Sequence, residues 1–452
     1  METPVCDFVR KYAESESIRL HMPGHKGTGS LGCEARDLTE IAGADNLSAP
    51  AGILAQSEQN ASALFGCPTF YSAEGSSLCI RAMLYLAVLF AQHRGRKPVI
   101  LAARNAHRTF LTAAVLLGFE IIWLPVSGSY LSADISPELL RGTLAALDAP
   151  PAALWLTSPD YLGNLADIRA AAEICHERNI LLLTDAAHGA YLRFLPESLH
   201  PADLGADLCC TSAHKTLPVL TGGAYLHCAA SLPADLVSAV RTALALFSST
   251  SPSYLILQSL DACNAELETA FPQRLRALLP ELDAVRAELT AAGWTLCGAE
   301  PMKLTLMPKA RGYTGTELAS ILQNAGICEE FADPDYLVLM PSPYNRTEEL
   351  RRLVAVLCGL PRRTAVPEAP PPLTVPERVC SPRTALFSET ERLPAAECIG
   401  RICAELTVSC PPAVPVIMCG ERVDAAVVRT LAYYGTDTLT VCRLPFASES
   451  CC

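Results

Sequence analysis

Residues 179–215 read NILLLTDAAHGAYLRFLPESLHPADLGADLCCTSAHK, and this stretch decides the fold class. Two short apolar runs within it, Asn179–Thr184 and Ala206–Ser212, have the length and composition of buried strands. Each run is followed at once by polar residues, Asp185 after the first and His214-Lys215 after the second. The stretch predicts two neighbouring strands of a sheet whose ends carry ionisable side chains.

The same pattern continues on the N-terminal side of this stretch. Pro98–Ala102 precedes a predicted helix over Asn105–Leu117, and Ala152–Thr157 precedes another over Leu165–Arg178. Strands that alternate with helices of this length are typical of a mostly parallel sheet covered by helices on both faces. We therefore expect an α/β fold.

The remainder of the chain predicts smaller parts. The first forty residues are mixed and contain several glycines, which favours an irregular arm, whereas Tyr254–Ala292 favours helix. The proline-rich sequence PRRTAVPEAPPPLTVPE predicts an extended linker. We expect an N-terminal arm over 1–40, a large domain over 41–295, a small α+β domain over 296–360, the linker over 361–377 and a C-terminal domain over 378–452.

Composition excludes several function classes. The chain has 452 residues, 35 Lys+Arg and 47 Asp+Glu, which gives a net charge of −12. Nucleic-acid binders carry the opposite excess. Apolar stretches such as Ala82–Ala91 are about half of the roughly 20 residues that a membrane span needs. The charged N-terminus does not resemble a signal peptide. We expect a cytoplasmic protein that binds neither nucleic acid nor membrane.

The 20 cysteines are scattered along the chain, without C-x-x-C and without a cluster at zinc spacing. We expect free thiols, most of them buried as small apolar groups, and no metal site. Cys451 and Cys452 end the chain, where air can oxidise them.

Lys215 is one of six lysines in the chain. Ligands of open α/β sheets bind at the carboxyl ends of the strands, which is where the pattern puts this residue. Desolvation behind a buried strand would favour the neutral amine, the form that attacks an aldehyde to give a Schiff base. The alternative is a surface lysine in a strand–helix turn.

Asp185 follows a buried run, where a carboxylate needs a cationic or hydrogen-bonding partner. It is either a functional acid or the N-cap of the next helix. A lysine and an acid at neighbouring strand ends suit pyridoxal phosphate (PLP), because its aldehyde binds lysine and its ring nitrogen is kept protonated by an acid.

An anion site is predicted at Gly75-Ser76-Ser77, before a helix expected to begin near Leu78. Backbone N–H groups, hydroxyls and the positive helix end attract phosphate, although a serine there is also an ordinary N-cap. His107 follows another strand; it either lies flat on an aromatic ring or is an ordinary hydrogen-bonded histidine.

Several motifs now point to one family. The chain resembles the Orn/Lys/Arg decarboxylases, PLP enzymes of the aspartate-aminotransferase fold (fold type I), in order and over nearly its whole length. The segments that carry the resemblance are RLHMPGHKGTG, DLTEIAGADNLSAPAG, TSPDYLGN, TDAAHGA, SAHKTLPVLTGGAYLH, SSTSPSYLILQSLD, EEFADPDYLVLMPSPYN, SPRTALF and PPAVPVIMCGERV. The length is similar to that of the shorter bacterial members.

The resemblance implies a role for each matching residue. Lys215 would hold PLP as a Schiff base, Asp185 would pair with the pyridinium nitrogen, and His107 would stack on the ring. Lys215 or a nearby histidine would return a proton to the substrate, so His107 and His214 count as catalytic. The other cofactor-binding residues would be Gly75, Ser76, Ser77, His188, Ser212, His214, Thr250 and Ser251. The last two would reach the cofactor of a neighbouring subunit, because the family's sites form at a dimer interface.

The implied reaction is decarboxylation of arginine, lysine or ornithine to the corresponding polyamine-pathway amine and CO2. The alternatives are another fold type I enzyme, an aminotransferase or lyase, and a degenerate homologue without catalysis. Three departures from the family pattern bear on the substrate: Glu74 stands where a neutral residue is usual, Cys410–Val414 replaces Tyr-Pro-Pro-Gly-Ile, and Cys419 replaces the proline of Pro-Gly-Glu.

Overall fold

The computed structural model describes residues 1–125, 135–408 and 414–444. Contacts divide the chain into two compact units. Unit 1 comprises Met1–Pro98, Ala149–Ser158 and Ile168–Arg276, and unit 2 comprises Val99–Asp148, Pro159–Asp167 and Ala277–Cys452. The domain boundaries expected from the sequence stay a prediction.

The sheet of unit 1 contains the strands that the opening stretch predicts. Its order is β1-β7-β6-β5-β4. Strands β4, β5 and β6 run parallel, and β7 runs antiparallel to both of its neighbours, β6 and β1. The strand bounds are β1 Thr69–Ser72, β4 Ala153–Thr157, β5 Leu181–Asp185, β6 Leu208–Thr211 and β7 Ala224–Cys228. Strands β5, β6 and β7 are buried along their whole length, which is why they are apolar without alternation.

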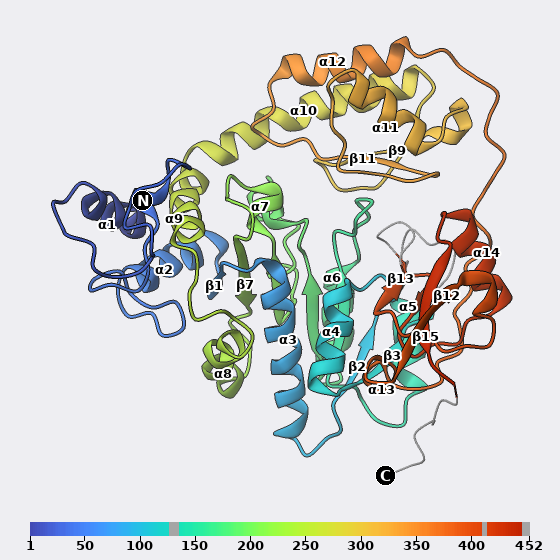
Figure 1. Cartoon of the computed structure of the whole chain (residues 1–452), viewed down its shortest axis with the longest axis horizontal. Coiled ribbons are helices and arrows are strands. Elements are labelled where there is room, and N and C mark those ends of the chain that lie inside the picture. The colour runs from blue at the N-terminus through green and yellow to red at the C-terminus, as the bar shows by residue number, and fades with distance from the viewer. Residues whose placement is uncertain (126–134, 409–413, 445–452) are drawn as a thin grey trace. The chain divides into compact units, whose positions relative to one another are not determined.

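The helices of unit 1 surround these strands. Their bounds are α1 Pro4–Ala13, α2 Ile53–Phe65, α3 Gly75–Gln92, α6 Ile168–His176, α7 Ala213–Thr216, α8 Ala234–Ala245 and α9 Tyr254–Glu268. Helix α3 packs against β7, β6 and α8 (Figure 1). By length and composition it is the one described helix that could cross a membrane, yet 61% of that stretch is buried inside the protein. The apolar stretch is thus longer than we expected from the sequence, but most of it lies in the core.

The N-terminal arm is not irregular throughout, because α1 is a regular helix. Val5 and Val9 on one of its faces are fully buried. The carboxylate of Asp261 in α9 accepts hydrogen bonds from the backbone N–H groups of Val5 and Cys6, at 3.0 and 2.9 Å. These bonds satisfy donors that the first helical turn leaves unpaired. A tertiary contact therefore stabilises a helix that local sequence did not predict.

His200 is fully buried in unit 1, and neither of its ring nitrogens has a hydrogen-bond partner among the described residues. Its ring packs against Phe65 and His227, with centroids 5.6 and 4.8 Å away. Burial lowers the pKa of His200 from 6.5 to about 4. The folded protein therefore keeps this ring neutral at a pH where the unfolded chain already binds a proton.

We expect this histidine to make unfolding more favourable in acid. Stability falls as the pH drops below 6.5, and the loss levels off below about 4, where both states are protonated; the interval corresponds to about 3 kcal/mol. Urea unfolding of the parent and His200→Leu at pH 7 and pH 4.5 checks this, since the variant should lose less stability on acidification. Phe65→Leu provides the control, because it alters the packing around His200 without removing a titrating group and should keep the parent's pH dependence. Equal losses in the parent and His200→Leu would contradict the assignment.

Unit 2 begins with a strand–helix–strand segment. Strand β2 (Val99–Ala102) pairs in parallel with β3 (Glu120–Trp123), and α4 (Arg108–Leu117) lies between them in sequence. A four-stranded antiparallel sheet of order β10-β11-β9-β8 follows. The remaining bounds are α5 Pro137–Ala145, α10 Ala270–Ala291 (shared with unit 1), β8 Thr295–Cys297, β9 Leu304–Met307, α11 Gly315–Asn324, β10 Phe331–Ala332, β11 Leu337–Leu339 and α12 Thr347–Gly359. Residues 361–377 contain neither helix nor strand.

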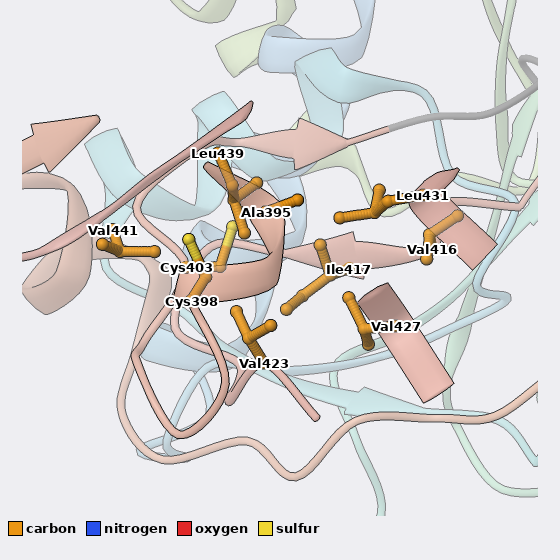
Figure 2. Packing of buried hydrophobic residues seen from close by; sticks show 10 residues of the cluster. All are labelled: Ala395, Cys398, Cys403, Val416, Ile417, Val423, Val427, Leu431, Leu439 and Val441. Atoms are coloured by element: carbon orange, nitrogen blue, oxygen red, sulfur yellow. The ribbon is translucent and has the colours of Figure 1, made fainter. Parts of the chain in front are cut away.

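The C-terminal part of unit 2 has its own hydrophobic core (Figure 2). Figure 2 shows Ile417 and Val423 among the side chains gathered around Cys398 and Cys403. Strands β12 and β15 pair antiparallel, as do β13 and β14. The bounds are α13 Pro382–Leu386, β12 Thr390–Pro394, β13 Thr407–Val408, β14 Ile417–Met418, α14 Ala425–Tyr433 and β15 Thr438–Cys442.

Candidate active site

The carboxyl ends of three parallel strands meet at one edge of the unit 1 sheet. The register pairs Thr157 of β4 with Asp185 of β5, and Asp185 with Cys210 of β6. Lys215 follows β6 directly, in the short helix α7. The predicted meeting of Asp185 and Lys215 at neighbouring strand ends is therefore present within unit 1.

Asp185 is the last residue of β5 and is buried, with 3% of its surface exposed. Its Oδ1 atom accepts a hydrogen bond from the backbone N–H of Ala187 at 3.1 Å and contacts the thiol of Cys210 at 3.7 Å. Among the described residues, both contacts of this carboxylate go to Oδ1. The arrangement leaves Oδ2 for a ligand, and a buried carboxylate is suited to a cationic ring N–H.

Lys215 contacts His188, which is also a predicted cofactor-binding residue. Its Nζ lies 3.0 Å from Nε2 of His188, which is buried. The side chain of Lys215 is exposed in the single chain. The prediction that burial desolvates its amine is therefore wrong for the single chain. The sequence showed that Lys215 follows a buried strand, but it did not show that α7 keeps the side chain in contact with solvent.

His214, the residue before Lys215, points back to the backbone. Its Nδ1 lies 2.9 Å from the carbonyl oxygen of Gly223. Because a carbonyl only accepts hydrogen bonds, Nδ1 carries the proton and Nε2 is the free acceptor of the neutral ring. The turn thus fixes one tautomer of His214.

The predicted anion site combines two segments of unit 1. Ser212, which precedes α7, donates from its hydroxyl to the hydroxyl of Ser76 at 2.9 Å. Helix α3 begins at Gly75, three residues earlier than expected, so Ser76 and Ser77 lie in its first turn and Glu74 is the N-cap. Gly75 has φ +70°, and a Cβ there would meet no atom within 4 Å, which leaves space beside the helix end. Hydroxyls and a helix N-terminus with open space beside it fit a phosphate group.

Glu74 contacts the segment that carries Thr250 and Ser251. Its Oε1 accepts a hydrogen bond from the backbone N–H of Ser249 at 2.6 Å. The carboxylate of Glu74 therefore binds the start of the 249–251 loop. This contact explains how an acid is accommodated beside the predicted anion site. Thr250 and Ser251 are both exposed, and their reach into a neighbouring subunit stays a prediction.

His107 lies in unit 2, where its ring contacts Thr109. It is the N-cap of α4, where its ring accepts from the backbone N–H of Thr109 at 3.3 Å. The cap explains why α4 begins at Arg108 rather than at Asn105. The ring is exposed, and stacking on a cofactor stays a prediction.

Most of the cysteines lie in the part of the chain that the structure describes. Seventeen are described and all are free thiols; Cys410, Cys451 and Cys452 lie outside the described residues, as does most of the Cys410–Val414 departure. No group of three metal-binding side chains occurs within 1–125, 135–408 and 414–444. Cys419 is buried and packs in a small cluster with Cys380 and Cys442, so the replacement of proline there is accommodated in a core.

Comparison with known proteins assigns the family. The model of the Orn/Lys/Arg decarboxylase major domain matches residues 3–295, and that of the C-terminal domain matches residues 372–445. The chain belongs to the Orn/Lys/Arg decarboxylase family. An arginine decarboxylase of Bacillus subtilis is 30% identical, with 93% of this chain and 91% of the relative covered. One of Halalkalibacterium halodurans is 31% identical, with 96% and 92% covered.

Solved structures bear out the fold class. A lysine decarboxylase of Francisella novicida matches with a TM-score of 0.80 at 17% identity, over 98% of this chain and 81% of that one. The serine palmitoyltransferase of Sphingomonas wittichii matches with 0.56 at 15% identity, over 78% and 82%. The expected fold type I architecture is therefore confirmed. Membership of the Orn/Lys/Arg decarboxylase family also confirms the expected enzyme class, a PLP-dependent amino acid decarboxylase.

Proposed function

We propose that this protein decarboxylates a basic amino acid, with arginine as its substrate and Lys215 as the residue that binds PLP covalently. The relatives named arginine decarboxylase, which match over more than nine-tenths of the chain, support arginine. One observation supports the site more than any other: the parallel strands β5 and β6 bring Asp185 and Lys215 to one sheet edge.

Each group of the proposed site has a separate task. When bound, PLP supplies an electron sink for the pair of electrons that departing CO2 leaves behind. The carboxylate of Asp185 accepts a hydrogen bond from the protonated ring nitrogen and so keeps that proton in place. Ser76 would donate its hydroxyl to the phosphate at the start of α3, and Ser212, whose hydroxyl donates to that of Ser76, would lie beside it. His107 covers the face of the ring.

Proton movement falls to the residues around Lys215. Its Nζ is 3.0 Å from Nε2 of His188, close enough for one to pass a proton to the other. We propose that Lys215 Nζ delivers the proton to the substrate's Cα after CO2 leaves. His188 holds the lysine amine in place through the contact of its Nε2 with Nζ and returns to it a proton taken up from solvent.

A product assay tests the reaction and the substrate together. The PLP-loaded protein is given arginine, lysine or ornithine separately, and amines and keto acids are identified by mass spectrometry. We expect agmatine and CO2 from arginine, with a kcat/KM at least about 100-fold above that for lysine, because a pocket that hydrogen-bonds a guanidinium leaves some of those partners unpaired when lysine binds. An accumulating keto acid would indicate the aminotransferase alternative. PLP binding without any product would indicate the degenerate alternative. The expected homodimer or higher homo-oligomer and the cytoplasmic location stay predictions.

A further inference from the structure

Arg104 is a fully buried cation in the loop that leads to His107. The loop runs from the end of β2 to the start of α4, and Ala103, Asn105 and Ala106 are buried as well. A guanidinium without solvent needs an anion, since an unpaired charge is expensive in a protein interior. The position of that anion therefore helps to determine the conformation of the loop.

That partner is Glu421, which lies 317 residues further along the chain. Nη1 of Arg104 donates to Oε1 at 2.6 Å and Nη2 donates to Oε2 at 2.8 Å. Only 2% of the glutamate side chain is exposed. Two parallel bonds between planar groups fix their relative orientation as well as their distance. The pair therefore restrains both the position and the orientation of Arg104 in the loop.

Glu421 is itself held firmly. Its Oε2 also accepts from the backbone N–H of Met418 at 2.8 Å, and its own N–H donates to the carbonyl of Met418 at 3.1 Å. Gly420 has φ +91°, and a Cβ there would come within 2.5 Å of the carbonyl oxygen of Cys380. The turn is flanked by Ile417 and Val423, two side chains of the core in Figure 2. The carboxylate is thus presented by a rigid part of the C-terminal core.

We infer that Glu421 is a positioning residue for His107, and that through it the C-terminal core sets the shape of the β2–α4 loop. His107 lies three residues after Arg104, and it also caps α4. The inference rests on the proposed function, in which His107 covers the cofactor ring. On this inference the C-terminal core helps to position His107, although the core itself does not contact the substrate.

The neighbouring contacts allow the loop to be tested separately from the fold. Arg383 donates to the carbonyl of Val115 at 2.6 Å, near the end of α4, and Arg378 donates to the carbonyl of Ile121 in β3. These bonds hold the C-terminal core against α4 and β3 without involving the side chain of Glu421. Loss of the Arg104–Glu421 pair should therefore loosen the β2–α4 loop, while the C-terminal core stays attached to α4 and β3.

The test compares Glu421→Gln with Glu377→Gln. Glu377 forms an exposed pair with Arg422, next in sequence to Glu421, so its variant controls for loss of an acid in the same part. For Glu421→Gln we expect amide hydrogen exchange at residues 103–107 to rise about 10-fold and the Kd of PLP to rise about 10-fold, with a weaker visible circular dichroism band of the bound cofactor. Glu377→Gln should match the parent in all three. Unchanged exchange and an unchanged cofactor band in Glu421→Gln would overturn the inference.

Two further variants cover the other outcomes. Arg104→Met/Glu421→Met removes both charges at similar volume, so it should remain folded even if Glu421→Gln does not; a parent-like cofactor band in that protein would also overturn the inference. His107→Ala alone should weaken the band, and adding Glu421→Gln to it should weaken it no further. If His107→Ala has no effect, the proposed role of His107 fails. If the two effects add, His107 keeps its role and Glu421 loses the one inferred here.

Discussion

Replacing Lys215 with alanine should lower kcat by at least about 1000-fold and remove the visible absorption of covalently bound PLP. The physical reason is that the variant loses both the amine that binds the aldehyde and the group that returns a proton to the product. Absorption spectra and steady-state rates with saturating PLP and arginine measure the two losses. The fold should survive, because the lysine side chain is exposed and lies in a four-residue helix.

Two controls separate covalent binding from charge. Lys215→Arg keeps the positive charge but cannot form the bond, so we expect it to be as inactive as the alanine variant. Lys97→Ala removes another exposed lysine, at a position distant in sequence from the strand ends, and should keep the parent's activity. Activity near the parent's level in Lys215→Arg would show that charge alone matters, which would contradict the covalent role.

The second large effect is expected from Asp185→Asn. The amide has nearly the same size but carries no negative charge, so it cannot keep the ring nitrogen protonated. We expect kcat to fall about 100- to 1000-fold, the range for loss of one preorganised electrostatic partner. Covalent attachment of PLP to Lys215 should persist, because the lysine and His188 are unchanged. Steady-state rates and the absorption spectrum measure these two properties separately.

Asp235→Asn is the matched control for this variant. Asp235 is an exposed acid in α8 that pairs with His93, so its replacement should leave both the rate and the spectrum unchanged. A rate for Asp185→Asn within about 2-fold of the parent, with PLP attached, would remove Asp185 from its proposed role.

The strands were the most predictable part of this fold. Strands β4, β5 and β6 lie within two residues of the predicted runs, because strands buried on both faces are continuous apolar stretches. The strand ends then placed Asp185 and Lys215 together without any tertiary information. His188 and Ser212 were also assigned to this region, and they contact Lys215 and Ser76 respectively.

Features that depend on distant contacts were not predictable. Helix α1 is stabilised by Asp261, more than 250 residues away in sequence. Arg104 follows the predicted run Pro98–Ala102 by two residues, but nothing near it in sequence indicates Glu421 as its partner. The exposure of Lys215 depends on how α7 packs, which an apolar stretch of sequence does not specify. In each case the missing information is tertiary rather than local.

Reductive trapping of the cofactor shows which lysine carries it, and we expect that lysine to be Lys215. The PLP-loaded protein is reduced with borohydride, which makes the covalent link permanent, then digested and mapped by mass spectrometry. We expect a single pyridoxyl group, on the peptide that contains Lys215. A pyridoxyl group on any of the other five lysines, or none on a protein that retains PLP and decarboxylates arginine, would contradict it.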